Sequence, residues 1–82
     1  MIRVAVFDDN LDRLESLKLL LEEEPDFKHV GSFTNGENAV SNVASCNPDV
    51  VLMDIEMPFV NGIKATRALR TAFPYLAILM QT

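Results

Sequence analysis

The sequence predicts an α/β fold in which helices cover both faces of a doubly wound parallel sheet. Three observations support this prediction: short apolar runs alternate with amphipathic stretches, the apolar runs have the length of strands, and Gly, Asn or Pro separates the segments. Strict alternation indicates crossover connections between parallel strands. We expect four strands and three helices, and the 82 residues are enough for one domain, 1–82.

The first two elements are expected to be a strand over 2–7 and a helix that follows Asn10. The run over 2–7 is short and contains β-branched residues, which favours a strand. Asn10 is a residue type suited to capping a helix N-terminus. The apolar positions after it recur at helical spacing: Leu11, Leu14, Leu17 and Leu21. We expect these leucines to face the core, and Pro25 requires the helix to stop at or before Glu24.

The rest of the chain repeats the alternation. The expected elements are a strand over 27–33, a helix over 37–45, a strand over 49–53, a helix over 63–73 and a strand over 75–80. Gly31 interrupts the second strand, and Pro48 and Pro74 follow the second and third helices. The run Val50–Met53 is apolar at every position, which is typical of a central strand covered on both faces.

Composition excludes several classes of function. Seven basic against twelve acidic residues give a net charge of −5 and a pI near 4.6, which argues against a nucleic-acid-binding face. The longest nearly apolar run, 75–80, is too short to cross a bilayer, and the N-terminus lacks the pattern of a signal peptide. Cys46 is the single cysteine, so neither an intrachain disulfide nor a cysteine-based metal site can form. These features predict a soluble, cytoplasmic protein.

Carboxylates follow two of the predicted strands at the point where each strand ends. Asp8 and Asp9 follow the first strand, and Asp54 follows the third. In open parallel sheets, ligands bind at the carboxyl ends of the strands beside a topological switch point. Three adjacent carboxylates repel one another unless a cation balances them, and Mg²⁺ suits oxygen ligands and leaves room for a phosphate. The alternative is that these residues are solvated loop residues and helix caps.

Several segments together resemble the receiver domain of two-component response regulators. The matching segments are 2–10 (Ile-Arg-Val-Ala-Val-Phe-Asp-Asp-Asn), 35–39 (Asn-Gly-Glu-Asn-Ala), 48–54 (Pro-Asp-Val-Val-Leu-Met-Asp), 54–58 (Asp-Ile-Glu-Met-Pro), Asn61-Gly62 and Thr82. They occur in order and at matching spacing along the whole chain. The resemblance implies a flavodoxin-like fold that lacks the last helix, strand and helix of a complete receiver.

The resemblance also implies roles for individual residues. Asp54 would accept a phosphoryl group from a sensor histidine kinase or a phosphotransfer protein. Asp9 would bind Mg²⁺ directly, Asp8 would act mostly through water, and Glu56 would contribute its backbone carbonyl. Thr82 would be the hydroxyl that moves towards the phosphoryl oxygens. In this family the first helix commonly meets the kinase, so Asp12 and Arg13 are candidate contact residues.

A complete receiver also carries a lysine that contacts the phosphoryl group, and this residue cannot be assigned here. Lys64 stands at the start of the third helix, in the wrong place to substitute. We expect the chain to be part of a longer receiver or to have its last strand covered by a partner chain in a homodimer or swapped dimer, because an apolar edge strand favours pairing.

Two other functions remain open at this point. The first is a pure interaction or dimerisation module whose pocket is not phosphorylated. The second is an aspartate-nucleophile phosphatase of the haloacid dehalogenase type, although such enzymes usually place Asp-x-Asp after the first strand. The favoured interpretation is a phosphoacceptor switch and not an enzyme with independent turnover.

Overall fold

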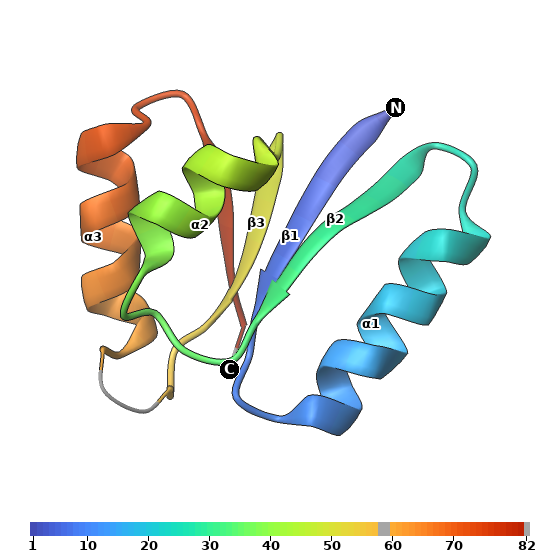
Figure 1. Cartoon of the computed structure of the whole chain (residues 1–82), viewed down its shortest axis with the longest axis horizontal. Helices are drawn as coiled ribbons and strands as arrows, with labels where there is room; N and C mark the ends of the chain where they lie inside the picture. The colour runs from blue at the N-terminus through green and yellow to red at the C-terminus, as the bar shows by residue number, and fades with distance from the viewer. Residues whose placement is uncertain (58–59, 82) are drawn as a thin grey trace.

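A four-stranded parallel sheet forms the middle layer of the protein in the computed structural model, which describes residues 1–57 and 60–81 (Figure 1). The strands are β1 (Ile2–Phe7), β2 (Phe27–Phe33), β3 (Val50–Asp54) and β4 (Ala77–Gln81), and the helices are α1 (Leu11–Glu23), α2 (Ala39–Cys46) and α3 (Gly62–Ala72). Helix α1 covers one face of the sheet, whereas α2 and α3 cover the other. The predicted doubly wound α/β fold is confirmed.

The strand order is β2-β1-β3-β4, and every pair is parallel. From β1 the chain passes through α1 to β2 on one side, and then returns past β1 to β3 on the other. The direction of winding therefore reverses between β1 and β3. This reversal is a topological switch point, where the carboxyl ends of neighbouring strands leave room for a ligand.

The sheet separates two apolar layers, because successive side chains of a strand point to opposite faces. Val4 and Val6 of β1 pack with Leu14 of α1 on one face. On the other face, the buried residues that pack with α2 and α3 are Ala5, Phe7, Ala39, Val43, Val51, Met53, Met57, Ala65, Leu69 and Ile78. All positions of β1 from Val4 to Phe7 are buried, so the strand that leads into the predicted site is fixed on both faces.

Small differences from the predicted elements have local causes. The register between β1 and β2 shifts beside Gly31, as expected for a glycine within a strand. Helix α2 begins at Ala39 and not at 37, because the side chain of Asn35 accepts a hydrogen bond from the Glu37 amide in a turn. Leu11 was expected in the core, but this first residue of α1 is 69% exposed.

Within residues 1–57 and 60–81, no helix combines the length and the apolar character that a membrane crossing requires.

Candidate functional site

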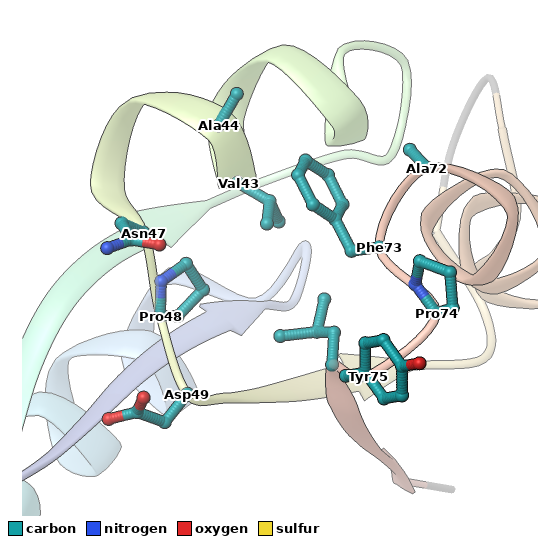
Figure 2. Close-up of a pocket in the computed structure, with 10 residues that line it drawn as sticks. Val43, Ala44, Asn47, Pro48, Asp49, Ala72, Phe73, Pro74 and Tyr75 are labelled. Carbon is teal, nitrogen blue, oxygen red and sulfur yellow. The ribbon is translucent and has the colours of Figure 1, made fainter.

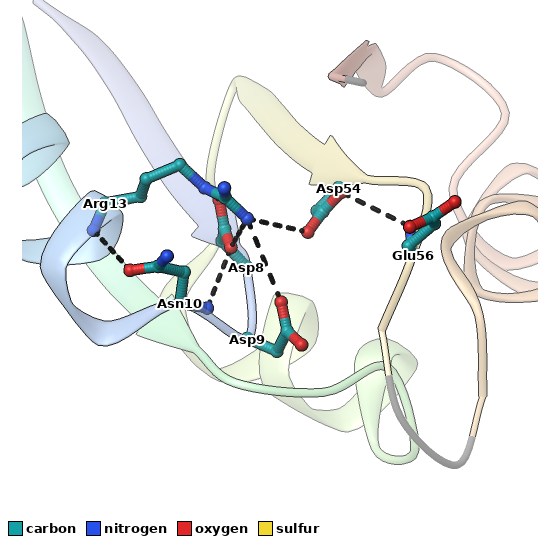
Figure 3. A network of polar contacts seen from close by, with 6 residues as sticks. All are labelled: Asp8, Asp9, Asn10, Arg13, Asp54 and Glu56. Carbon is teal, nitrogen blue, oxygen red and sulfur yellow. Dashed lines mark hydrogen bonds and ion pairs between the residues drawn. The ribbon is translucent and has the colours of Figure 1, made fainter.

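Three carboxylates meet at the carboxyl ends of β1 and β3 (Figure 3). Asp8 and Asp9 directly follow β1, and Asp54 is the last residue of β3. The two strands are paired neighbours, with Phe7 opposite Met53. An oxygen atom from each carboxylate lies within 4.8 Å of the other two. The predicted proximity of these residues at the switch point is thus present in the structure.

The Asp8 carboxylate is buried and has hydrogen-bond partners on both oxygen atoms. Its Oδ1 accepts from the backbone amide of Asn10 at 2.9 Å and from Nη2 of Arg13 at 2.9 Å, and its Oδ2 accepts from Nε of Arg13 at 2.8 Å. Hydrogen bonds from a guanidinium favour the ionised carboxylate. They hold the pKa of Asp8 below its ordinary value, although burial acts in the opposite direction.

The Asp54 carboxylate has weaker partners. Oδ1 accepts from the Glu56 backbone amide at 3.2 Å, and Oδ2 lies 3.4 Å from Nη2 of Arg13. Removal from water raises the pKa of Asp54, and the nearby charges of Asp8 and Asp9 raise it further. The Glu56 amide and the Arg13 charge oppose this shift but do not reverse it. Asp54 therefore retains more capacity for a new positive partner than Asp8 does.

Arg13 is the one residue of this cluster whose place the sequence did not indicate. The resemblance made Arg13 a candidate for contacting the kinase, and that contact stays a prediction. In the structure its guanidinium lies over the three carboxylates. Asn10 caps α1 by accepting from the Arg13 amide at 3.1 Å, so Arg13 is the third residue of the helix. The sequence did contain one indication of this position. Arg13 belongs to the first turn of a helix that directly follows a strand, and such a turn stays close to the end of that strand.

Gly62 allows α3 to begin directly against the end of β3. Its amide donates to the Ile55 carbonyl at 2.8 Å. A Cβ atom on Gly62 would lie 2.0 Å from the backbone oxygen of Asp54, so only glycine permits this approach. Asn61 caps the helix by accepting from the Lys64 amide at 3.0 Å. The Asn61-Gly62 pair, one of the segments that resemble a receiver, thus holds α3 against the backbone of Asp54 and Ile55.

A pocket of about 330 Å³ opens over the cluster and is lined by Asp9, Arg13, Asp54, Ile55 and Glu56. Asp9 is 44% exposed, so its oxygens can be reached from the solvent. Carboxylate oxygens of this number and spacing fit a hard divalent cation such as Mg²⁺, which commonly binds one or two carboxylates and keeps several waters. The predicted residues Pro58 and Thr82 lie outside the described residues.

A second pocket, of about 530 Å³, lies at the opposite end of the sheet, where β3 and β4 begin (Figure 2). Its walls include Val43, Phe73 and Pro74, and the ring of Tyr75 stands at its edge fully exposed. Its one acidic side chain, Asp49, accepts a hydrogen bond from the Arg3 amide at 2.9 Å. This pocket lacks the paired carboxylates of the first, so the chemistry belongs to the carboxyl end of the sheet.

A parallel sheet with this strand order and an acidic pocket at its switch point defines a flavodoxin-like α/β protein. The similarity to solved structures agrees: the response regulator domain of Thermotoga maritima CheB superposes with a TM-score of 0.91 at 38% identity, over 98% of this chain and 59% of that chain. A LuxR-family two-component response regulator from Aurantimonas sp. gives 0.89 at 29% identity, over 98% of this chain and 57% of that chain.

The chain belongs to the response regulator receiver domain family, whose model matches residues 4–82. Among curated relatives, the transcriptional regulatory protein DegU of Brevibacillus brevis is 44% identical over 79 residues, which are 96% of this chain and 34% of that protein. A protein-glutamate methylesterase/protein-glutamine glutaminase of Nocardioides sp. is 42% identical over 79 residues, 96% of this chain and 22% of that protein. The chain therefore spans about a third or less of these relatives.

Proposed function

We propose that Asp54 is the phosphoacceptor of this receiver domain and that its phosphorylation drives a conformational switch. The observation that carries the proposal is the position of Asp54: it ends a central strand of a receiver fold, at the switch point, within reach of two further carboxylates. The weak hydrogen bonding of Asp54, compared with that of Asp8, leaves its oxygen atoms available to react.

In the proposed reaction an Asp54 oxygen attacks the phosphorus of a phosphohistidine. A phosphorus–oxygen bond forms while the phosphorus–nitrogen bond breaks, and its electron pair remains on the imidazole, which then takes up a proton. An anionic nucleophile and an anionic phosphoryl group repel each other, so the reaction depends on positioning and on positive charge in the pocket. The place of Asp54 at the end of β3 and the close contact of Gly62 with its backbone support this role.

Asp9 and Asp54 are the residues that we expect to hold Mg²⁺ directly, with Asp8 acting mostly through water and Glu56 through its backbone carbonyl. The bound ion would supply charge neutralisation between the carboxylate and the phosphoryl oxygens. The donor set supports this assignment, because the carboxylates of Asp8, Asp9 and Asp54 are gathered together and Asp9 and Asp54 line the pocket. The role of Thr82 as the switching hydroxyl stays a prediction.

The phosphoryl donor is proposed to be a sensor histidine kinase or a phosphotransfer protein, in the cytoplasm, where ATP-dependent kinases obtain their phosphoryl groups. We expect one phosphorylation per cycle and no independent turnover of small esters, in contrast to a haloacid dehalogenase-type phosphatase. The methylesterase activity in the name of one relative belongs to a protein of which this chain spans 22%. Any output activity of a longer parent protein is a separate proposal.

A partner chain along β4 also stays a prediction. Leu79 and Met80 on this edge strand are 58% and 40% exposed. Exposed apolar side chains beside unpaired backbone groups favour pairing with another chain. We expect the partner that pairs with β4 to be a second copy of this chain. Sedimentation at increasing protein concentration tests whether such a dimer forms.

Intact-mass spectrometry after incubation with acetyl phosphate tests the phosphoacceptor proposal. We expect one added phosphoryl group per chain with Mg²⁺, and none with a chelator or in Asp54→Asn. Asp26→Asn is the matched control, because Asp26 is an exposed aspartate between α1 and β2, at the opposite end of the sheet. Unchanged modification of Asp54→Asn would contradict the proposal, and turnover of a small phosphate ester with many phosphate releases per chain would favour the phosphatase.

A further inference from the structure

The guanidinium of Arg13 lies close to all three carboxylates, where its positive charge offsets their negative charges (Figure 3). Its Nη2 atom is 2.9 Å from Asp8 Oδ1, 3.4 Å from Asp54 Oδ2 and 3.9 Å from Asp9 Oδ1. Its Nε adds the 2.8 Å bond to Asp8 Oδ2. A single side chain thus brings positive charge to all three carboxylates.

Arg13 and a divalent cation would compete for the same oxygen atoms. Both oxygens of Asp8 already accept hydrogen bonds from Arg13, and the Asp8 side chain is 1% exposed, so a water-bridged contact from Asp8 to a metal ion requires Arg13 to withdraw. Asp54, whose Oδ2 atom lies 3.4 Å from Arg13, also lines the pocket that a metal would enter. Two cations cannot approach these oxygens together without strong repulsion.

Because Arg13 lies in the first turn of α1, its guanidinium can leave the carboxylate cluster easily when a metal cation takes its place at the carboxylates. A positive charge in the first turn of a helix is opposed by the helix dipole. The carboxylates of Asp8 and Asp54 offset this effect. The Arg13 side chain is 57% exposed, so it can extend into water without disturbing the core.

We propose that Arg13 is a tethered counterion that holds the carboxylate cluster in the metal-free protein and must leave it before a divalent cation binds. The inference rests on the proposed function in that the cation is the one used for phosphorylation. By thermodynamic linkage, a group that stabilises only the metal-free state lowers metal affinity by the same factor. Arg13 is therefore a positioning residue that sets the metal concentration at which Asp54 becomes reactive.

Metal affinity is measured directly with Mn²⁺, whose free ion is counted by electron paramagnetic resonance and which Mg²⁺ displaces. We expect Arg13→Ala to bind Mn²⁺ at least about fivefold more tightly than wild type, the low end of coupling between sites. Arg13→Gln should do the same and keeps a polar side chain in case the alanine variant folds poorly. Arg67→Ala is the control, because it removes the same charge from an exposed position on α3, on the other face of the sheet.

The wild-type protein provides a second readout that needs no variant. The Nε–H group of Arg13 donates a hydrogen bond to Asp8. The proposal therefore predicts that its nuclear magnetic resonance signal exchanges slowly with water when no metal is added. Saturating Mg²⁺ should make this signal exchange like that of a free arginine. A signal that stays protected would overturn the proposal, because Arg13 would then be part of the metal-loaded site.

The results separate this inference from the phosphoacceptor function. Equal Mn²⁺ affinity of Arg13→Ala and wild type, in a protein that is still phosphorylated at Asp54, overturns the counterion role alone. Tighter Mn²⁺ binding by the variants in a protein that acetyl phosphate does not modify supports the counterion role and overturns the proposed function. A protein that binds no Mn²⁺ with or without Arg13, and is not modified, overturns both.

Discussion

The ends of β1 and β3 lie side by side and each carries an aspartate, but the two carboxyl groups have opposite electrostatic surroundings. Asp8 accepts three hydrogen bonds, two of them from a guanidinium, and its pKa is lowered. Asp54 is held more loosely, and burial together with the Asp8 charge raises its pKa. Asp8 therefore stabilises the folded cluster, whereas Asp54 keeps the unused bonding capacity that a nucleophile needs.

The largest change in the free energy of unfolding is expected from a substitution that disturbs the backbone at the end of β3. Gly62→Ala places a methyl group against the Asp54 carbonyl, and we expect a loss of about 3 kcal/mol in the free energy of unfolding. Urea denaturation measures it. Gly31→Ala is the comparison, because there the added atom would meet the ring of Phe33, which can move. A loss for Gly62→Ala no larger than that for Gly31→Ala would show that the contact with Asp54 does not restrict α3.

The second-largest change in stability is expected at the end of β1. Asp8→Asn weakens hydrogen bonds to a charged donor, and we expect a loss of about 2 kcal/mol at pH 7 in the presence of a chelator. Since the folded-state pKa of Asp8 is lowered, its contribution is present above about pH 4 and disappears as the pH falls through the folded-state value. Urea denaturation as a function of pH should therefore show the two proteins converging in acid. A constant difference would contradict the role of the Asp8 charge.

At Asp54 we expect a change in stability of the opposite sign to that at Asp8. Because its pKa is raised in the folded protein, the ionised carboxylate costs stability at neutral pH, and Asp54→Asn should be more stable than wild type by less than the amount lost in Asp8→Asn. The wild-type protein should regain this stability as the pH falls through the raised pKa and Asp54 takes up a proton. Thermal unfolding at several pH values without metal measures the difference. A destabilised Asp54→Asn protein would remove the contrast between the two strand ends.

The smallest effect belongs to the third carboxylate. Asp9 is 44% exposed and lies 3.9 Å from a guanidinium that is itself 57% exposed, and such surface pairs contribute little. We expect Asp9→Asn to change the free energy of unfolding by about 0.5 kcal/mol or less. The same variant should bind Mn²⁺ more weakly if Asp9 is a direct ligand. A large change in stability would mean that Asp9 shares the structural role of Asp8.

The arrangement of the strands, and with it the meeting of Asp8 and Asp54, was predictable from the sequence. Right-handed crossover connections commonly make the first and third strands neighbours, and in a parallel sheet the carboxyl ends of neighbouring strands lie at one edge. The capping role of Asn10 was predicted and is confirmed. These features depend on short stretches of chain and on the handedness of connections, so they can be inferred from local patterns.

The different surroundings of Asp8 and Asp54 could not be predicted in the same way. They depend on the rotamer of Arg13, whose guanidinium reaches back from α1 to the cluster, and on the Gly62 contact that fixes Asp54. A charged residue on a predicted helix face is usually solvated, so the sequence favoured a partner contact for Arg13. Side-chain direction is determined by three-dimensional packing, and residue spacing alone does not supply it.

The most direct test of the account is to locate the phosphoryl group itself. Borohydride reduces an aspartyl phosphate to homoserine, so peptide mass spectrometry after treatment with acetyl phosphate and Mg²⁺ identifies the modified residue. Wild type should contain homoserine at position 54 and aspartate at positions 8 and 9. Homoserine at position 8 or 9, or none at position 54 in the folded protein, would contradict the assignment of Asp54 as the phosphoacceptor.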